Sequence, residues 1–126
     1  MRVLLDTAVL IFAVATPERL SKRAARVLGS ARTVRELSSV SLAEIAIKNA
    51  LGKLDVPAAM VHRAIEDMDL HVLPFSADHA FKIFELPVFH RDPFDRQLIA
   101  QALCEEIPIV TPDEKFRLYR ELTLVW

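Results

Sequence analysis

Short apolar runs alternate along the chain with longer segments in which apolar and polar positions are mixed. Apolar runs of this length are typical of strands covered on both faces, as in parallel sheets. The runs that we predict to form strands are residues 3–5, 37–40, 71–73, 107–110 and 122–125. Because Pro108 has no amide hydrogen, it is expected among the first residues of its strand rather than in the middle.

The mixed segments have the spacing and the boundary residues of helices. Residues 93–105 are the clearest case, because Phe94, Leu98 and Ile99 share one face and Asp92 precedes a proline at the helix start. Further helices are expected directly after Asp6, at residues 17–28, 41–51, 57–68 and 114–120, and from Ser76 to before Pro87, with stops at Gly29 and Gly52. The alternation predicts an α/β fold, in which residues 1–126 form a single domain with a mostly parallel central sheet flanked by helices.

Composition narrows the class of protein. The chain has 126 residues, of which 52% are hydrophobic and 26% are charged, as is typical of one globular domain. Two glycines are too few for a glycine-rich phosphate loop, and one cysteine excludes an internal disulfide or a multi-cysteine zinc site. The apolar stretch at residues 7–17 is shorter than the roughly 20 residues that a membrane span needs. We therefore expect a soluble cytoplasmic protein without a membrane partner.

Four acidic residues lie where predicted strands pass into helices. Asp6 follows the first strand, Glu44 lies shortly after the second, Asp95 begins the helix at residues 93–105, and Asp113 follows the strand at residues 107–110. In an open parallel sheet these positions meet at one edge, where ligands bind. Helix capping is the alternative: Ser41 with Glu44 has a capping-box pattern, Asp95 follows the cap residue Asp92, and Asp113 precedes a helix. Asp6 has no evident cap to serve.

Four carboxylates at one edge would repel one another. One pair at 4 Å costs about 4 kcal/mol at an effective dielectric constant near 20, so either some acids are protonated or a cation lies between them. Oxygen ligands without cysteine or histidine favour Mg²⁺ or Mn²⁺ over zinc, and water bound to such an ion hydrolyses phosphodiesters. The hydroxyls of Thr7 and Thr111 either orient a carboxylate or a water or cap helices. The hydroxyl of Ser41 caps its helix or contacts a phosphate.

Basic residues are concentrated in the first half of the chain. Residues 1–63 carry ten Lys and Arg against five Asp and Glu, whereas residues 64–126 carry six against twelve, and the net charge is −1. A predicted helix face holds Arg19, Lys22, Arg23 and Arg26, which indicates either a solvated surface or contacts with RNA phosphates or an acidic partner segment. Lys48 and Arg96 lie near Glu44 and Asp95 and form either ion pairs or phosphate contacts.

Histidines show no metal-ligand spacing in this sequence. We interpret all four of them as structural or surface residues. His90 is the exception to examine, because the polar loop that contains it directly precedes the candidate site.

Four segments of the chain together resemble a known family. They are Leu4-Leu5-Asp6-Thr7, Ser41 to Lys48 (SLAEIAIK), His90 to Ala100 (HRDPFDRQLIA) and Thr111-Pro112-Asp113. These segments resemble the motifs of PIN domains, and most of all those of VapC-like toxins from type II toxin–antitoxin systems. The resemblance covers essentially the whole chain in the expected order, and the second and third segments make it specific.

The resemblance implies a Mg²⁺- or Mn²⁺-dependent endoribonuclease that acts on RNA, is inhibited by a cognate antitoxin and forms a homodimer. It assigns the metal and the catalysis to an acidic quartet of Asp6, Glu44 (directly or through a water), Asp95 and Asp113. It gives Thr111 an orienting role and makes Asp92 a motif residue rather than a ligand. Two positions depart from the pattern, since Ala8 stands where many members have histidine and Ala43 where many have tryptophan. These changes concern substrate or partner contacts more than metal binding.

Two other functions also place acids at strand ends. A receiver-like phosphoacceptor domain uses Mg²⁺ and an aspartate, but it also needs a lysine at a strand end, and none stands out here. A non-catalytic RNA-binding or interaction module with the same fold would have a degenerate site. The presence of all four acids argues against degeneracy.

Overall fold

Five parallel strands form the centre of the molecule. The computed structural model describes residues 1–126 and orders the strands β3-β2-β1-β4-β5. Their bounds are β1 Arg2–Leu5, β2 Val34–Ser38, β3 His71–Leu73, β4 Ile109–Val110 and β5 Leu124–Val125. All four neighbouring pairs are parallel, which confirms the predicted sheet.

The order of the strands reverses beside β1. The chain proceeds outward from β1 to β2 and β3, and then crosses to the other side to form β4 and β5. Leu5, the last residue of β1, is in register with both Leu37 of β2 and Val110 of β4. In open α/β sheets such a switch point leaves a crevice at the carboxyl ends of the strands, which is the usual place for a ligand.

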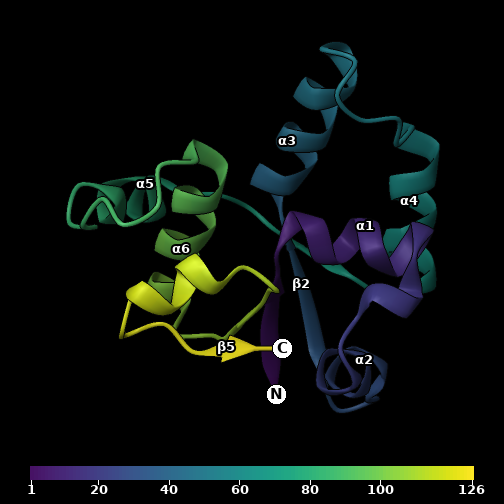
Figure 1. Cartoon of the computed structure of the whole chain (residues 1–126), viewed down its shortest axis with the longest axis horizontal. Helices are drawn as coiled ribbons and strands as arrows, with labels where there is room; N and C mark the ends of the chain where they lie inside the picture. The colour runs from purple at the N-terminus through teal and green to yellow at the C-terminus, as the bar shows by residue number, and fades with distance from the viewer.

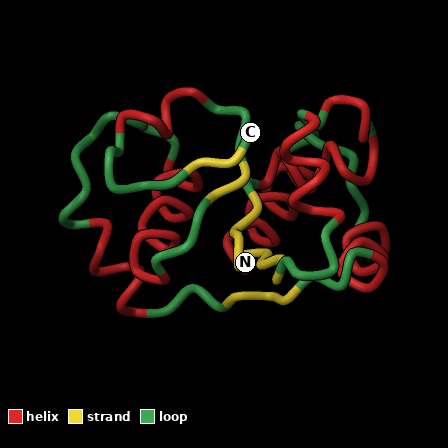
Figure 2. The backbone as a smooth tube through the Cα atoms, turned by 90° about the horizontal axis from the view of Figure 1, so that it is seen from below, coloured by secondary structure: helices red, strands yellow, loops and turns green.

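Helices cover both faces of the sheet (Figure 2). Val3, Leu5 and Leu37 point to a core shared with α1 (Thr7–Ala15), α2 (Lys22–Gly29), α3 (Ser39–Ala50) and α4 (Ala58–Asp67). Leu4 and Ile109 point to the opposite core, which contains residues of α6 (Pro93–Glu105) and the 3₁₀ helix η2 (Glu114–Leu118), while α5 (Ala77–Ile83) packs against α6. Alternate residues of the central strands therefore face different layers, as the pleat requires. None of the helices is long and apolar enough to cross a bilayer.

The structure corrects several predicted boundaries. The helix expected at residues 17–28 is broken into a 3₁₀ turn, η1 (Pro17–Arg19), and α2, because the Ser21 hydroxyl accepts from Ala24 N and caps a new helix. The strand expected at residues 37–40 is β2, which ends at Ser38. Ser38 caps α3 by accepting from Val40 N, so the capping box predicted for Ser41 and Glu44 is wrong.

Elements near the end of the chain are shorter than predicted. The strands expected at residues 107–110 and 122–125 shrink to the two-residue strands β4 and β5, and Pro108 lies just outside β4. The helix expected at residues 114–120 is η2. The helices that follow Ser76 and Asp92 begin where predicted, because both side chains cap them.

Candidate metal centre at the carboxyl ends of the strands

Four different elements bring the predicted acids to one edge of the sheet. Asp6 directly follows β1, and Asp113 follows β4, so these two flank the switch point. Glu44 extends from α3, which follows β2, and Asp95 lies in the first turn of α6. The charges of Asp6, Glu44 and Asp113 all raise the pKa of Asp95, as expected for carboxyl groups gathered at one edge of the sheet.

Asp6 is buried and held by two donors. The Thr111 hydroxyl donates to its Oδ2 at 2.7 Å, and Ala8 N donates to Oδ1 at 3.4 Å. Burial raises the pKa of Asp6, although both hydrogen bonds oppose the shift. Asp6 is also the N-cap of α1, which corrects the expectation that it serves no cap. The same residue therefore starts a helix and presents a carboxylate at the site.

Thr111 connects the two acids that flank the switch point. Its hydroxyl donates to Asp6 and accepts from the backbone N of Asp113 at 3.1 Å. Asp113 Oδ1 accepts from Lys115 N and caps η2, so the predicted capping role holds beside its place in the cluster. A single buried hydroxyl thus sets the relative position of the carboxylates of β1 and β4.

Glu44 has one oxygen without a partner. Lys48 Nζ donates to Oε2 at 2.5 Å, whereas Oε1 is buried and makes no hydrogen bond. An unsatisfied buried carboxylate oxygen is costly in a folded protein. The nearby hydroxyl of Thr7 donates to Ser41 at 2.8 Å and ties α1 to α3. Neither hydroxyl contacts a carboxylate, so of the three predicted supporting groups only Thr111 does.

Asp95 is the acid whose ionisation is most perturbed. Burial is the largest cause, and the charges of Asp6, Asp92, Glu44 and Asp113 add to it, which raises the pKa of Asp95 to about 8. The folded protein therefore holds a proton on this carboxyl at neutral pH unless a positive charge replaces it. A strongly perturbed acid in a cleft is a common mark of a functional site.

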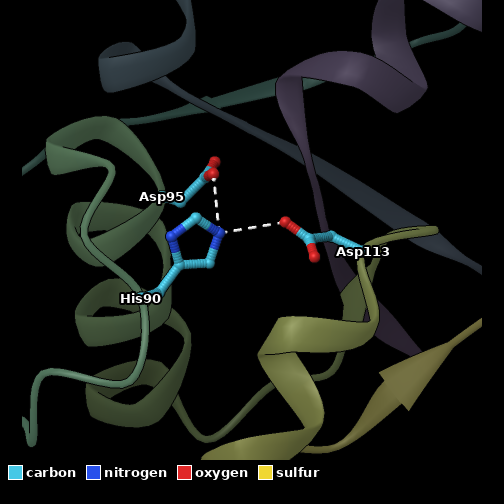
Figure 3. A group of neighbouring side chains, drawn as sticks. All are labelled: His90, Asp95 and Asp113. Carbon is cyan, nitrogen blue, oxygen red and sulfur yellow. Dashed lines mark hydrogen bonds and ion pairs between the residues drawn. The ribbon is translucent and has the colours of Figure 1, made fainter.

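His90 is a member of the site that the sequence analysis placed among structural residues. Figure 3 shows its ring between Asp95 and Asp113, with Nε2 at 3.1 Å from Asp95 Oδ2 and 2.9 Å from Asp113 Oδ2. The ligand atoms of the three residues all lie within 4.8 Å of one another. The only signal in the sequence was its polar loop directly before the capped start of α6.

Some of the basic residues predicted to contact RNA lie at the acidic site, and others lie far from it. Lys48 is at the site, and hydrogen bonding to Glu44 raises the pKa of its ammonium group, with Asp92 and Asp95 adding to the shift. The Arg96 guanidinium donates to the carbonyls of Pro87 and His90 and holds the loop before α6.

The basic face of α2 lies away from the acids. Figure 1 shows α2 beside the amino ends of β1 and β2, whereas the acidic site is at their carboxyl ends. Lys22, Arg23 and Arg26 are exposed there, and the Arg19 guanidinium lies 4.3 Å from the Phe12 ring centroid. The structure does not bring these four residues together with the acidic quartet.

The chemistry of the donor set fits a hard divalent cation. Asp6, Glu44, Asp95 and Asp113 offer only carboxylate oxygens, which suit Mg²⁺ or Mn²⁺. The unpaired Oε1 of Glu44 and the proton retained on Asp95 are both features that a bound cation would remove. Lys48 is the only ammonium group paired with one of these acids, so the cluster carries an excess of negative charge.

Comparison with known proteins gives a family and a fold. The PIN domain family model matches residues 3–122, whereas no curated protein sequence matches the chain. Similar solved structures include VapBC2 from Rickettsia felis bound to a promoter DNA fragment (TM-score 0.70, 20% identity, 98% of this chain and 97% of that chain). VapBC from Salmonella typhimurium bound to DNA has a TM-score of 0.67 at 19% identity, covering 98% and 96% of the two chains. VapBC-5 from Mycobacterium tuberculosis, of the VapBC family of toxin–antitoxin systems, has a TM-score of 0.61 at 16% identity, covering 98% and 97%.

Proposed function

Because the chain belongs to the PIN domain family, we propose that it is a Mg²⁺- or Mn²⁺-dependent endoribonuclease that hydrolyses phosphodiester bonds of RNA. The observation that supports this most directly is the convergence of four carboxyl groups on the switch point of the sheet, with one buried oxygen unpaired and one pKa raised to about 8. Such a site gains stability from a cation.

The residues that would hold the cation are Asp6, Asp95 and Asp113, with Glu44 binding directly or through a water. When bound, the cation would activate a water for attack and offset negative charge on the phosphate. Thr111 fixes the carboxylate of Asp6 through a 2.7 Å hydrogen bond, so this oxygen is oriented before any substrate arrives. A hydrogen bond of this kind orients a metal ligand in advance.

Lys48 would contact a substrate phosphate beside the carboxylates. Its ammonium group is about one-third exposed and is held against Glu44, so it offers remaining N–H donors toward solvent at the rim of the site. A positive charge at this place would attract an RNA phosphate in spite of the acidic cluster. Arg96 is the weaker candidate, because its guanidinium already serves the carbonyls of the loop before α6.

The biological role that we propose is that of the toxin in a type II toxin–antitoxin pair in the cytoplasm. The similar solved structures are toxin–antitoxin complexes, and each is matched over nearly its full length. The expected partner is therefore a cognate antitoxin protein. Copurification of the chain with the product of an adjacent reading frame, and loss of cleavage in that complex, would test this role.

A second copy of the chain is the other expected partner. Phe89 and Leu118 are half exposed beside a pocket of about 520 Å³, and the side chains around the pocket carry both signs of charge. The charged residues that line it are Lys82, Glu85, Arg120 and Glu121. A patch with balanced charges is able to pair with itself across a two-fold axis. Light scattering at micromolar concentration should give a dimer mass, and Leu118→Glu should give a monomer.

Cleavage of RNA is the direct test. Antitoxin-free protein is incubated with total cellular RNA and Mg²⁺ or Mn²⁺, with EDTA and Asp6→Asn as controls. Asp55→Asn serves as a matched variant, because Asp55 is an exposed acid outside the site. We expect discrete fragments from the wild type and Asp55→Asn, and none with EDTA or Asp6→Asn. RNA binding that is insensitive to EDTA, without cleavage, would instead favour a non-catalytic RNA-binding module.

A further inference from the structure

His90 is fixed on every side except the one that faces the acids. Its backbone N donates to the Tyr119 hydroxyl at 3.0 Å, and that hydroxyl donates to Pro87 O at 2.9 Å. The imidazole meets the Phe116 ring edge to face, with 5.4 Å between ring centroids, and only 6% of the residue is exposed. A ring held this firmly places Nε2 with little freedom between Asp95 and Asp113 (Figure 3).

The hydrogen bond at the other ring nitrogen determines where the proton lies. Asp92 N donates to His90 Nδ1 at 3.2 Å, so Nδ1 is an acceptor and carries no hydrogen. The proton is therefore on Nε2, which acts as a donor toward the carboxylates. A nitrogen that carries a proton has no lone pair for a metal, so this arrangement makes His90 a donor to the ligands rather than a ligand.

We propose that His90 is a positioning residue, whose Nε2–H donates to Oδ2 of Asp113 while Nε2 lies 3.1 Å from Oδ2 of Asp95, and which so holds the two carboxyl groups side by side for the cation. The inference rests on the proposed function, since it concerns the metal centre of the nuclease. It adds a hydrogen-bond donor to the carboxylates of that centre. Groups that hydrogen-bond to metal ligands orient them, and their loss typically weakens metal binding about 10- to 100-fold.

A second histidine in the molecule offers a matched comparison. His79 Nδ1 accepts from Ser76 N, its Nε2 contacts Glu105, and it is 5% exposed, so it repeats the pattern of His90 away from the acids. Replacement of either ring by phenylalanine removes the donor and keeps an aromatic ring. Only the replacement at position 90 should alter the binding of metal.

Calorimetric titration of Mn²⁺ into RNA-free protein tests the inference without any assay of cleavage. We expect His90→Phe to weaken Mn²⁺ binding about 10- to 100-fold. His79→Phe should bind Mn²⁺ as the wild type does. His90→Gln, whose amide nitrogen reaches the position of Nε2, should restore most of the affinity. Circular dichroism confirms that each variant is folded.

Three results would overturn the role of His90. Wild-type or tighter affinity in His90→Phe would show that the donor is dispensable or that it competes with the cation. Equal losses in His90→Gln and His90→Phe would make His90 a ligand through its lone pair. In metal-free protein, the ¹⁵N chemical shifts of His90 should show a hydrogen on Nε2. A hydrogen on Nδ1 alone would contradict the proposal. This measurement does not depend on whether the wild type binds Mn²⁺. Absence of Mn²⁺ binding by the wild type would instead count against the proposed function.

Discussion

Buried and partly buried acids form two clusters in the fold, and their surroundings are opposite. Toward the amino ends of the strands, Glu36 accepts from Arg2 Nε at 2.9 Å and also contacts His71, while Arg2 Nη2 reaches Glu105 at 2.9 Å. At the carboxyl ends, Asp6, Glu44, Asp95 and Asp113 share Lys48 as their only ammonium partner. In the first cluster the Arg2 guanidinium pairs with both acids, whereas in the second one ammonium group serves four carboxyl groups.

The directions of the pKa shifts express this difference. Hydrogen bonds from His79 and Arg2 lower the pKa of Glu105, so the folded protein favours its charged form. Burial and neighbouring acids raise the pKa of Asp95 to about 8, so folding disfavours its charge. Acids that stabilise a fold are expected to show the first behaviour, and acids that await a positive ligand the second. Glu105 and Asp95 therefore differ in the way that a structural acid and a metal-binding acid are expected to differ.

Asp6→Asn should have the largest effect and should affect activity alone. We expect RNA cleavage to fall roughly 10²- to 10³-fold, the loss seen when one preorganised charge-stabilising group is removed. The asparagine oxygen can still accept from Ala8 N while its NH₂ group donates to the Thr111 hydroxyl, and one repelling charge is gone, so the metal-free protein should unfold at the same or a higher temperature. Cleavage rates and thermal melts measure the two effects. A large fall in melting temperature would place Asp6 with the structural acids.

Glu36→Gln should lower the stability of the protein and leave its activity unchanged. Its carboxylate is buried and bonded to Arg2 and His71, and hydrogen bonds to charged groups contribute about 1.5–3 kcal/mol. We expect the free energy of unfolding in urea to fall by about 2 kcal/mol, while cleavage per folded molecule stays unchanged. Lost cleavage in a fully folded Glu36→Gln sample would remove the distinction between the two clusters.

Stability of the metal-free protein should fall as the pH rises. Because the pKa of Asp95 is about 8 in the folded protein and about 4 in an unfolded chain, the folded state holds an extra proton between these values. The corresponding stability is complete below about pH 4 and is lost as pH passes 8. Melts in EDTA from pH 5 to 9 should show a steeper decline for the wild type than for Asp95→Asn. Saturating Mn²⁺ should flatten the wild-type curve.

The test compares the pH profiles of the wild type and Asp95→Asn, because several other ionisable groups lie beside Asp95. The ionisable groups around it are Asp6, Glu44, Lys48, His90, Asp92 and Asp113. Asp95→Asn leaves all of these in place. Parallel curves for the wild type and Asp95→Asn would contradict a raised pKa for Asp95.

Lys22→Ala combined with Arg23→Ala should have the smallest effect. Both residues are exposed on α2, beside the amino ends of the strands and away from the acids (Figure 1). We expect unchanged cleavage at saturating RNA and at most weaker binding of long RNA. The slope of log affinity against log salt concentration should then fall by about one for each phosphate that the protein no longer neutralises. A fall in the saturated rate would show that this face takes part in the reaction itself.

Sequence pattern was sufficient for the fold class and for the acids that meet at the sheet edge. It was insufficient for β2, which was predicted three residues too late. Charged residues such as Arg35 and Glu36 are not typical of a buried strand. Glu36 can be buried because its carboxylate bonds to Arg2 and His71, and these partners lie 34 and 35 residues away in the sequence. A local pattern cannot show a charge that is neutralised by a distant residue.

The same limit explains His90. Its partner Asp113 is 23 residues away, and Tyr119, which fixes its backbone, is 29 residues away. The break at Ser21 is a different kind of error, since a serine within an apparently continuous helical pattern can cap a new helix instead. Both cases show that side-chain hydrogen bonds, rather than hydrophobic spacing, decide the details at the site.

The hydrogen bond from Thr111 to Asp6 joins residues 105 positions apart, and β1 finds β4 only across that interval. During translation, Asp6 and Glu44 are made well before Asp113, and a domain of this kind folds as a unit. The carboxylate cluster therefore cannot be complete before β4 and Asp113 have been made. A nascent chain that carries Asp6 and Glu44 but not yet Asp113 has no finished centre, so the order of the elements along the chain delays assembly of the site until β4 has been made.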